Sequence, residues 1–349
     1  MEQTAQNSYP TVDIVVLNYN GKRFLDACFQ SLRQTNYPAF KVYLLDNAST
    51  DDDVSYVQQH FPEVEILRIK VNRGFCAAYN YAFKHCTGKY FVCLNNDVMV
   101  KPDWIKHLVN EAESDERIAS LQPKMVSYLD ESKFEYAGAS GGMIDIYGYP
   151  FARGRLFYKL EDDKGQYDDT TSIFWACGAA MFIRKSVLDE LGDFDETIVH
   201  HMDEIDLNWR MHMQGYTSKV VPQSVILHYG GATIAPASYK KTYWNHRNSI
   251  YLMLKNFETH NALTKVPLHI IFDYVTALRG LFMLNFKTVR AIFNAHLWLT
   301  IHWGTIRKNR RISQSKRQVN DKEILKKMYP RSVVLQYFFF RRKTYQQLP

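Results

Sequence analysis

The stretch NRGFCAAYNYAFKHCTGKYFVCLNN, residues 72–96, contains in turn a glycine-centred loop, a helix-period segment and a short apolar strand. Gly88 ends the helical pattern, and residues 90–94 are typical of a buried strand. That strand delivers two asparagines and Asp97 at its carboxyl end, where open α/β sheets bind ligands. A carboxylate there, beside a loop and helix N-terminus that can hold phosphate, suits a metal-bound diphosphate. A plain polar turn is the alternative interpretation.

The first hundred residues alternate between strand and helix patterns. Apolar runs at 12–17, 42–45 and 64–69 are separated by segments with helical spacing. This order predicts an α/β fold with a mostly parallel sheet and right-handed crossovers. The first strand is not followed by GxGxxG, which disfavours a dinucleotide-binding Rossmann domain. Between 127 and 171 the alternation fails, and we expect loops and a β-ribbon there.

Composition narrows the class of protein and its partners. The hydrophobic content of 46% supports a large core, and five cysteines without a CxxC pair argue against a disulfide framework. We therefore expect a reducing compartment. Residues 305–349 hold 13 Lys or Arg against 2 Asp or Glu, a local charge of +11 that leaves −4 for the rest. A basic tail on a near-neutral body points to an anionic surface, either nucleic acid or a membrane.

Two further segments carry polar groups suited to chemistry. Residues 203–210, DEIDLNWR, have a helical pattern that begins with adjacent acids. Such acids either complement the helix dipole or act on a substrate, and the pattern leaves both open. His228 follows an apolar run at 225–227. A single histidine in that position is more often a packed side chain than a ligand.

Eight short motifs together identify a family. They stand in one order along roughly residues 12–235: VVLNYNG (15–21), DNAST (46–50), NRGFCAAYN (72–80), LNNDV (94–98), CGAAMFIRK (177–185), FDE (194–196), DEIDLNWR (203–210) and LHYGG (227–231). Each motif is weak alone, but eight in register are a specific signal. By these motifs the chain resembles family 2 glycosyltransferases with the GT-A fold, and in particular the rhamnosyltransferase-like branch of bacterial surface-polysaccharide synthesis.

The resemblance implies a pocket for a nucleotide-sugar donor, which could be a dTDP-, UDP- or GDP-sugar. In that pocket Asp46 would accept hydrogen bonds from the base. The other residues that the resemblance assigns to donor binding are Leu17, Asn18, Arg73, Gly74, Asn80, Asn95 and Asn96.

The resemblance also implies a metal site and a general base. Asp97 matches the last acid of the family's DxD motif, and His228 matches its C-terminal histidine. The first acid of DxD is Asn95 here, which leaves fewer charges for the metal. Oxygen ligands with one histidine suit Mg²⁺ or Mn²⁺. Glu204 maps onto the base of the family's acidic pair, but the pair is reversed here, so Asp203 remains an alternative.

These assignments predict an inverting, metal-dependent glycosyltransferase that acts on a lipid-linked or polysaccharide acceptor, with rhamnose among the candidate sugars. Two other functions are considered. A sugar-phosphate nucleotidyltransferase would need a glycine-rich basic loop after the first strand, and NYNGKR at 18–23 is a poor version of it. A non-catalytic, membrane-bound saccharide-binding protein would be favoured by loss of the metal acid and the base, yet Asp97 and the acids at 203–206 are present.

The motifs and the change in composition suggest two parts. Residues 1–240 are expected to form the GT-A catalytic domain, with a nucleotide-binding half at 1–125 and an acceptor-binding, catalytic half at 126–240. Residues 241–349 are expected to form a helical, amphipathic and basic extension that associates with a membrane.

That extension predicts peripheral attachment to the cytoplasmic, inner face of the plasma membrane. No stretch in it reaches about 20 residues free of charge, so a spanning helix is not expected. Trp298 and Trp303, followed by the basic run at 307–311, suggest an interfacial anchor on anionic lipid. Nucleic acid is disfavoured, because the tryptophans precede the charges instead of alternating with them.

Overall fold

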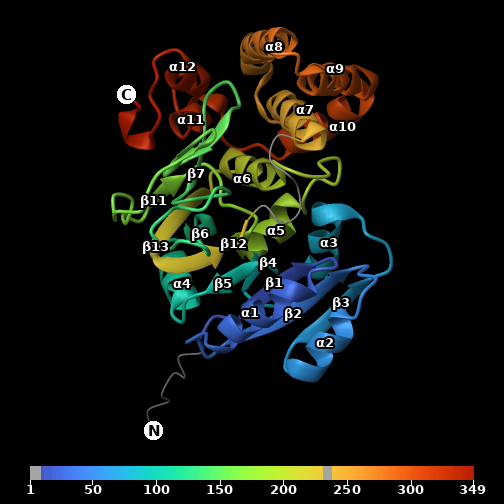
Figure 1. Ribbon diagram of the computed structural model, residues 1–349, viewed down its shortest axis with the longest axis vertical. Coiled ribbons are helices and arrows are strands. Elements are labelled where there is room, and N and C mark those ends of the chain that lie inside the picture. Colours follow the sequence, from blue (N-terminus) through green and yellow to red (C-terminus); the bar gives the residue numbers. More distant parts are fainter. Residues whose placement is uncertain (1–8, 231–237) are drawn as a thin grey trace.

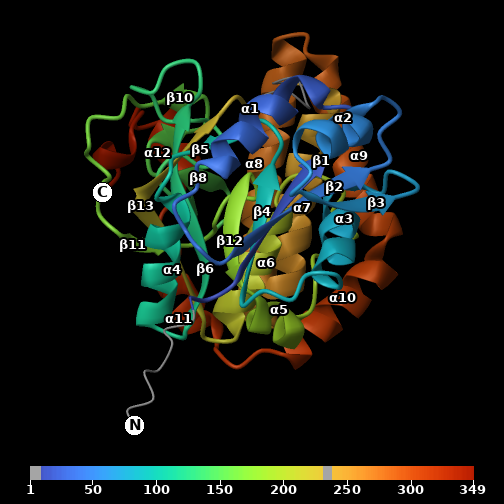
Figure 2. The same ribbon diagram turned by 90° about the horizontal axis from the view of Figure 1, so that it is seen from below.

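A large mixed sheet forms the centre of the protein (Figure 1, Figure 2). The computed structural model describes residues 9–230 and 238–349, so Gly231 of the LHYGG motif lies outside it. Within this part the sheet has nine strands in the order β11-β13-β6-β12-β4-β1-β2-β3, with β5 paired to β13. The strands are β1 Val12–Asn18, β2 Phe40–Asn47, β3 Glu65–Ile69, β4 Tyr90–Asn95, β5 Val98–Val100, β6 Ile118–Ser127, β11 Thr171–Ile173, β12 Ala180–Arg184 and β13 Thr217–His228.

The sheet is parallel in its first half and mixed in its second. Strands β4, β1, β2 and β3 are parallel neighbours, as are β6 and β13, whereas β12 runs antiparallel to both β4 and β6. This confirms the predicted α/β class with a mostly parallel sheet. Both faces are covered by helices, which explains why β1 reads as a continuous apolar run.

Alternate residues of β1 enter two separate hydrophobic cores. Ile14 and Val16 belong to the core that also contains buried residues of α1 and α4, while Val15 packs with α3 and α5 on the opposite face. The helices of this part are α1 Lys22–Arg33, α2 Asp53–His60, α3 Gly74–Phe83, α4 Trp104–Ser114, α5 Lys185–Leu191 and α6 Asp203–Met213.

The irregular segment 127–171 contains a small antiparallel sheet, in agreement with the predicted loops and β-ribbon. Its order is β10-β9-β8-β7, and the C-terminal segment packs against it through Val333, Tyr337 and Tyr345. The end of the basic tail is therefore part of the folded body. The strands of the small sheet are β7 Gly142–Ile144, β8 Pro150–Ala152, β9 Arg155–Leu156 and β10 Lys159–Leu160.

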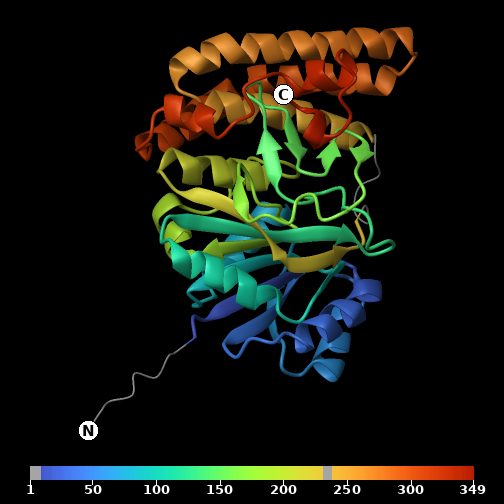
Figure 3. The same cartoon turned by 90° about the vertical axis from the view of Figure 1, so that its left-hand side faces the viewer.

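Helices from residue 239 onward form a further layer, with α8 outermost (Figure 3). Helix α7 contacts α6, α9 and α10, and α8 contacts α7 and α9. No helix in the described residues is both long and apolar enough to cross a membrane. The helices are α7 Tyr239–Asn256, α8 Thr259–Phe282, α9 Phe286–Ile301, α10 Trp303–Ser315, α11 Asp321–Lys326, α12 Val333–Phe338 and the 3-10 turn Tyr345–Gln347.

Two expectations about this layer need correction. Trp298, expected at a membrane interface, instead packs inward, with the Arg247 guanidinium 4.5 Å from its ring centre. Several cations of the basic tail also serve the fold. Arg310 donates to two backbone carbonyls at the end of α7, and Arg317 pairs with Asp321 at 3.1 Å. These cations cap helix ends, so less of the tail's charge is available to an external surface.

Candidate active site

The carboxyl ends of three parallel strands bring the predicted donor residues to one edge. The register pairs Asn18 of β1 with Asp46 of β2, and Leu17 of β1 with Asn95 of β4. The motifs at 15–21, 46–50 and 94–98 therefore meet, because parallel neighbours end at the same side of a sheet.

Asn18 connects these motifs through its side chain. Its Nδ2 donates to Asp53 Oδ2 at 2.5 Å, and its Oδ1 accepts from Asn96 Nδ2 at 2.6 Å. Asp53 Oδ2 also accepts from the backbone N–H of Gly21 at 2.9 Å. A Cβ on Gly21 would lie 2.0 Å from Asn96 Nδ2, so the close approach of the two loops requires glycine here.

Asp46 is a fully buried carboxylate with one free oxygen. Oδ1 accepts from the backbone N–H of Ser49 at 2.9 Å. Oδ2 has no hydrogen-bond partner in the described part of the chain, although Arg68 Nε lies 3.1 Å away at an angle unsuited to a hydrogen bond. A buried charged oxygen without a partner costs free energy, which a ligand's donor group would offset.

Asp97 and His228 come together although 131 residues separate them in the chain. Antiparallel pairing of β5 with β13 sets Val98 opposite His228, and His228 Nε2 lies 3.1 Å from Asp97 Oδ1. Both side chains are buried. On the other side of the ring, Nδ1 lies 3.1 Å from Glu135 Oε2. Burial lowers the pKa of His228, but the charge of Glu135 and the hydrogen bond that the ring donates to Asp97 outweigh it and raise that pKa to about 10.

Glu135 is a site residue that the sequence did not predict. It is buried at the start of the irregular segment, and its Oε2 also accepts from the backbone N–H of Ala137 at 2.6 Å. A carboxylate behind a histidine fixes the ring's orientation and tautomer, as it does behind metal-bound histidines generally. In the sequence, Glu135 is simply an acid in a stretch without periodicity. Nothing there distinguishes it from an acid on the surface.

The loop that starts α3 is joined to the FDE motif. Asn80 is buried, donates to the Phe194 carbonyl at 3.0 Å and to Glu196 Oε1 at 3.1 Å, and accepts from the Phe194 N–H. Arg73 is exposed, and its guanidinium reaches Glu196 at 3.3 Å. Gly74 has a φ of +84°, a conformation that glycine adopts without strain. Asn80 thus fixes the 194–196 segment, while the exposed Arg73 remains free to turn toward a ligand.

The two candidate bases stand at the first turn of α6. Asp203 is buried, and its Oδ1 accepts from the backbone N–H of Glu204 at 2.9 Å. Burial, and then the negative charge of Asp203, raise the pKa of Glu204 well above its usual range. Gly178 of the CGAAMFIRK motif lies beside them, where a Cβ would be 3.8 Å from that of Glu204. A carboxylate with a raised pKa is a stronger base, which suits Glu204 to accept a proton.

A strained turn precedes these acids. His201 and Met202 both have a left-handed backbone, with φ of 64° and 67°. Such residues cost about 1–3 kcal/mol each and persist only where neighbours hold them. Here Asn248 of α7 donates to the carbonyls of His200 and His201, each at 2.8 Å. A helix of the C-terminal layer therefore shapes the turn that precedes the two candidate bases.

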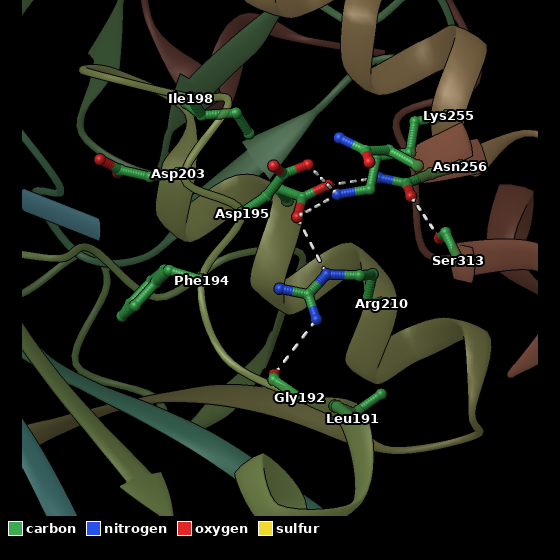
Figure 4. A network of polar contacts seen from close by, with 12 residues as sticks. Leu191, Gly192, Phe194, Asp195, Ile198, Asp203, Arg210, Lys255, Asn256 and Ser313 are labelled. Carbon is green, nitrogen blue, oxygen red and sulfur yellow. Dashed lines mark hydrogen bonds and ion pairs between the residues drawn. The ribbon is translucent and has the colours of Figure 1, made fainter. Parts of the chain in front are cut away.

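The second half of the DEIDLNWR motif belongs to a buried network (Figure 4). Asp206 Oδ2 accepts from Arg210 Nε and from Lys255 Nζ, each at 2.9 Å, and Oδ1 accepts from Asn256 Nδ2 at 2.9 Å. Lys255 also pairs with Asp195 Oδ2 at 2.6 Å. These contacts tie α6 to α7, which gives Asp206 and Arg210 a structural role.

A divalent metal at Asp97 and His228 would have to displace the proton that the raised pKa of His228 keeps on the ring, and it would need further ligands. Across residues 9–230 and 238–349, no three His, Cys, Asp or Glu side chains converge as a metal-binding group. Mg²⁺ is commonly held by one or two carboxylates together with substrate phosphates and water, and an imidazole is a better ligand for Mn²⁺ than for Mg²⁺. This donor set suits a metal that is bound together with a diphosphate.

Comparison with known proteins agrees with the motifs. Residues 13–192, just over half of the chain, match the family model described as Glycosyl transferase family 2. The chain is 27% identical over 240 residues to the O-antigen biosynthesis protein RfbC of Myxococcus xanthus, a match that covers 67% of this chain and 18% of that protein. It is 24% identical over 290 residues to an N-acetylglucosaminyl-diphospho-decaprenol L-rhamnosyltransferase of Mycobacterium tuberculosis (strain ATCC 25618 / H37Rv), covering 78% of this chain and 92% of that protein. The chain thus spans about a fifth of the first relative's length and nearly all of the second's.

A solved structure supports the fold. The crystal structure of GalNAc-T7 with UDP, GalNAc and Mn²⁺ superposes with a TM-score of 0.57 at 15% identity, over 73% of this chain and 49% of that one. This confirms the predicted GT-A type α/β fold.

Proposed function

The chain belongs to glycosyl transferase family 2, and on that premise we propose that it is an inverting glycosyltransferase of cell-surface glycan synthesis. It moves a sugar from a nucleotide-sugar donor to a lipid-linked or polysaccharide acceptor. The observation that carries this proposal is the convergence of Asn18, Asp46, Asp97 and His228 at one edge of the sheet, since this edge offers groups for both ends of a nucleotide-sugar.

The donor's base binds at Asp46, whose free buried oxygen suits an N–H of a pyrimidine or purine. The backbone of Leu17 and Asn18 completes the base subsite. The remaining donor residues of the proposal are Arg73, Gly74, Asn80, Asn95 and Asn96, with Asn80 acting by holding the 194–196 segment.

The leaving diphosphate lies at Asp97 and His228. A bound Mg²⁺ or Mn²⁺ supplies the Lewis acid that neutralises its charge. Asp97 and His228 are the protein groups that would hold the ion, and Glu135 orients the imidazole. Because Asn95 carries no charge, this ion depends on the diphosphate more than it would in a site with both acids.

Glu204 removes the proton from the attacking acceptor hydroxyl. The new bond joins that oxygen to the anomeric carbon, the bond to the diphosphate oxygen breaks, and the proton stays on the carboxylate. In-line attack with one base inverts the configuration. Asp203 is the alternative base. In the structure, Asp203 accepts a hydrogen bond from the backbone N–H of Glu204, and its negative charge makes Glu204 more basic.

The acceptor is lipid-linked and the enzyme works at the cytoplasmic face of the plasma membrane. Support comes from the mycobacterial relative, whose name describes transfer of L-rhamnose to a sugar on a lipid diphosphate. Rhamnose from a dTDP donor is accordingly the first sugar to test. The division into a catalytic domain at 1–240 and an extension at 241–349 remains a proposal, and the α6–α7 network makes the two parts interdependent.

A donor screen tests this function. The purified chain is incubated with UDP-, dTDP- and GDP-sugars, with Mn²⁺, Mg²⁺ or EDTA, and release of nucleoside diphosphate is measured. We expect release from one nucleotide class, dependent on the metal and abolished in Asp97→Asn. Release that persists in EDTA would reject the metal-dependent mechanism, and no release from any donor would reject the function.

A further inference from the structure

Helices α8 and α9 form a hairpin, residues 259–301, in the outermost layer of the protein (Figure 3). On α8 the exposed side chains include Ile271, Val275, Leu278 and Phe282, spaced by three, four and seven residues along one face. On α9 they include Phe293 and Ile301. Phe282 is 81% exposed. An exposed apolar surface of this extent marks an interaction site on a folded protein.

Helix α9 buries an apolar face, as surface helices ordinarily do, but the second half of α8 departs from that pattern. Among the buried residues of α8 are His269 and Asp273. Asp273 Oδ1 lies 2.6 Å from His246 Nδ1, and its Oδ2 lies 2.8 Å from His296 Nε2. Polar contacts hold the inner side of α8 while large apolar groups point outward. This arrangement suits an environment that is itself apolar.

The charges on the hairpin identify that environment. Between Thr259 and Trp303 the chain has four Lys or Arg and a single acid, Asp273, which is buried. Arg279, Lys287 and Arg290 are exposed. An apolar face flanked by cations alone complements an anionic lipid leaflet. In a symmetric dimer through this face the same cations would meet without acids, which disfavours a second copy as the occupant.

We propose that the α8–α9 hairpin is a monotopic membrane-binding element, which lies in the plane of an anionic leaflet and inserts its outer apolar side chains among the lipids. The hairpin replaces the basic tail and Trp298 as the principal anchor. The presence of a lipid-linked acceptor rests on the proposed function, but insertion of the hairpin does not.

Vesicle flotation of the full-length protein tests the proposal. Vesicles of phosphatidylcholine and phosphatidylglycerol are compared with phosphatidylcholine alone, at low and high salt. The test variant is Leu278→Asp with Phe282→Asp, and the matched control is Tyr9→Asp, which changes a residue that is 60% exposed and precedes β1. We expect the hairpin variant to lower vesicle partitioning by roughly tenfold or more, because two apolar side chains lose their burial in lipid. The control should bind as wild type does.

A second measurement detects insertion directly. All five native cysteines are buried free thiols, so a cysteine introduced at the surface can be labelled selectively. An environment-sensitive fluorophore on Phe282→Cys should shift to the blue with anionic vesicles and be quenched by lipids brominated in the acyl chain. The same label on Tyr9→Cys should respond to neither.

Three outcomes would overturn the proposal. The first is absence of wild-type binding at low salt, and the second is equal binding by wild type and the hairpin variant. The third is a lipid-free dimer in sedimentation velocity that the hairpin variant dissolves, which would assign the face to a second copy. The vesicle assays contain no nucleotide-sugar. A negative result in them would therefore reject the membrane-binding hairpin without bearing on the proposed glycosyltransferase function. Conversely, nucleoside diphosphate release by the hairpin variant should match that of wild type.

Discussion

Two clusters of buried charge differ in how completely their atoms are paired. In the α6–α7 network, both oxygens of Asp206 accept hydrogen bonds, from Arg210, Lys255 and Asn256. At the sheet edge, Asp46 Oδ2 accepts no hydrogen bond among the described residues and has only the exposed Arg68 Nε beside it, at 3.1 Å. Removing one partner of a fully paired buried charge destabilises the fold, whereas a buried oxygen that accepts no hydrogen bond is suited to a ligand.

The largest expected effect concerns Asp97. Asp97→Asn should lower turnover by several orders of magnitude, since the diphosphate loses a ligand of its neutralising metal, while the protein still folds. Initial rates measure the loss of turnover, and thermal denaturation measures whether the variant still folds. Asn95→Asp is the matched variant, and it should tighten Mn²⁺ binding in a calorimetric titration. If the Asp97→Asn enzyme were fully active, the buried charges at the sheet edge would not bind the ligand.

Glu204→Gln comes next, with an expected loss of about 10²–10⁴ in kcat and donor affinity within a few fold, because the base contacts the acceptor. Since the pKa of Glu204 is raised, the base becomes protonated as pH falls through that higher value. The acid limb of the kcat profile should therefore lie above the range of an ordinary carboxylate. If Asp203→Asn is inactive and Glu204→Gln is active, the two roles are exchanged.

For the network, Asp206→Ala should lower the free energy of unfolding by about 3–5 kcal/mol, because Arg210 and Lys255 lose their buried counter-charge. Urea denaturation measures the change. If the Asp206→Ala protein were as stable as wild type but inactive, the structural role of the α6–α7 network would be wrong. Asp206 would then behave like a ligand-binding acid.

Asp46→Asn should weaken donor binding by about 1.5–3 kcal/mol, which is the range for a hydrogen bond to a charged group. Titration of the nucleoside diphosphate alone isolates this effect from chemistry. Unchanged affinity, with an unchanged fold, would show that the free oxygen of Asp46 does not face the base.

The smallest effect is expected at the strained turn. Asn248→Ala removes two hydrogen bonds to the 200–201 carbonyls and should cost about 1–2 kcal/mol, divided between stability and kcat. Asn248→Asp is the informative partner, because it keeps the size but removes the donor. Should both variants match wild type in rate and melting temperature, α7 would have no part in shaping the turn.

Much of the sheet edge was predictable because it follows from local pattern and parallel register. The apolar runs before Asn18, Asp46 and Asn95 identify strands, and parallel strands align their carboxyl ends. Glu135 and Lys255 were not predictable in this way. Each reaches its partner from a segment whose position depends on tertiary packing, so neither spacing nor composition indicates the contact.

The α8–α9 hairpin shows a second feature that could not be predicted from the sequence. The spacing of Tyr274, Leu278 and Phe282 correctly predicts a helix with one apolar face. Periodicity does not determine whether that face turns inward or outward. The direction is set by the buried contacts of Asp273 with His246 and His296, which come from three helices and leave no trace in the local pattern.

The distance along the chain between Asp97 and His228 also determines when the two side chains can meet during synthesis on the ribosome. Strands β1 to β4 pair among themselves, but the imidazole reaches Asp97 only when β13 joins β5 and β6. At about 5–20 residues per second, a ribosome needs roughly 7–26 s to add the intervening 131 residues. During that interval the nascent chain lacks the strand that brings His228 to Asp97. Incomplete chains that end before β13 would therefore have Asp97 without its histidine partner.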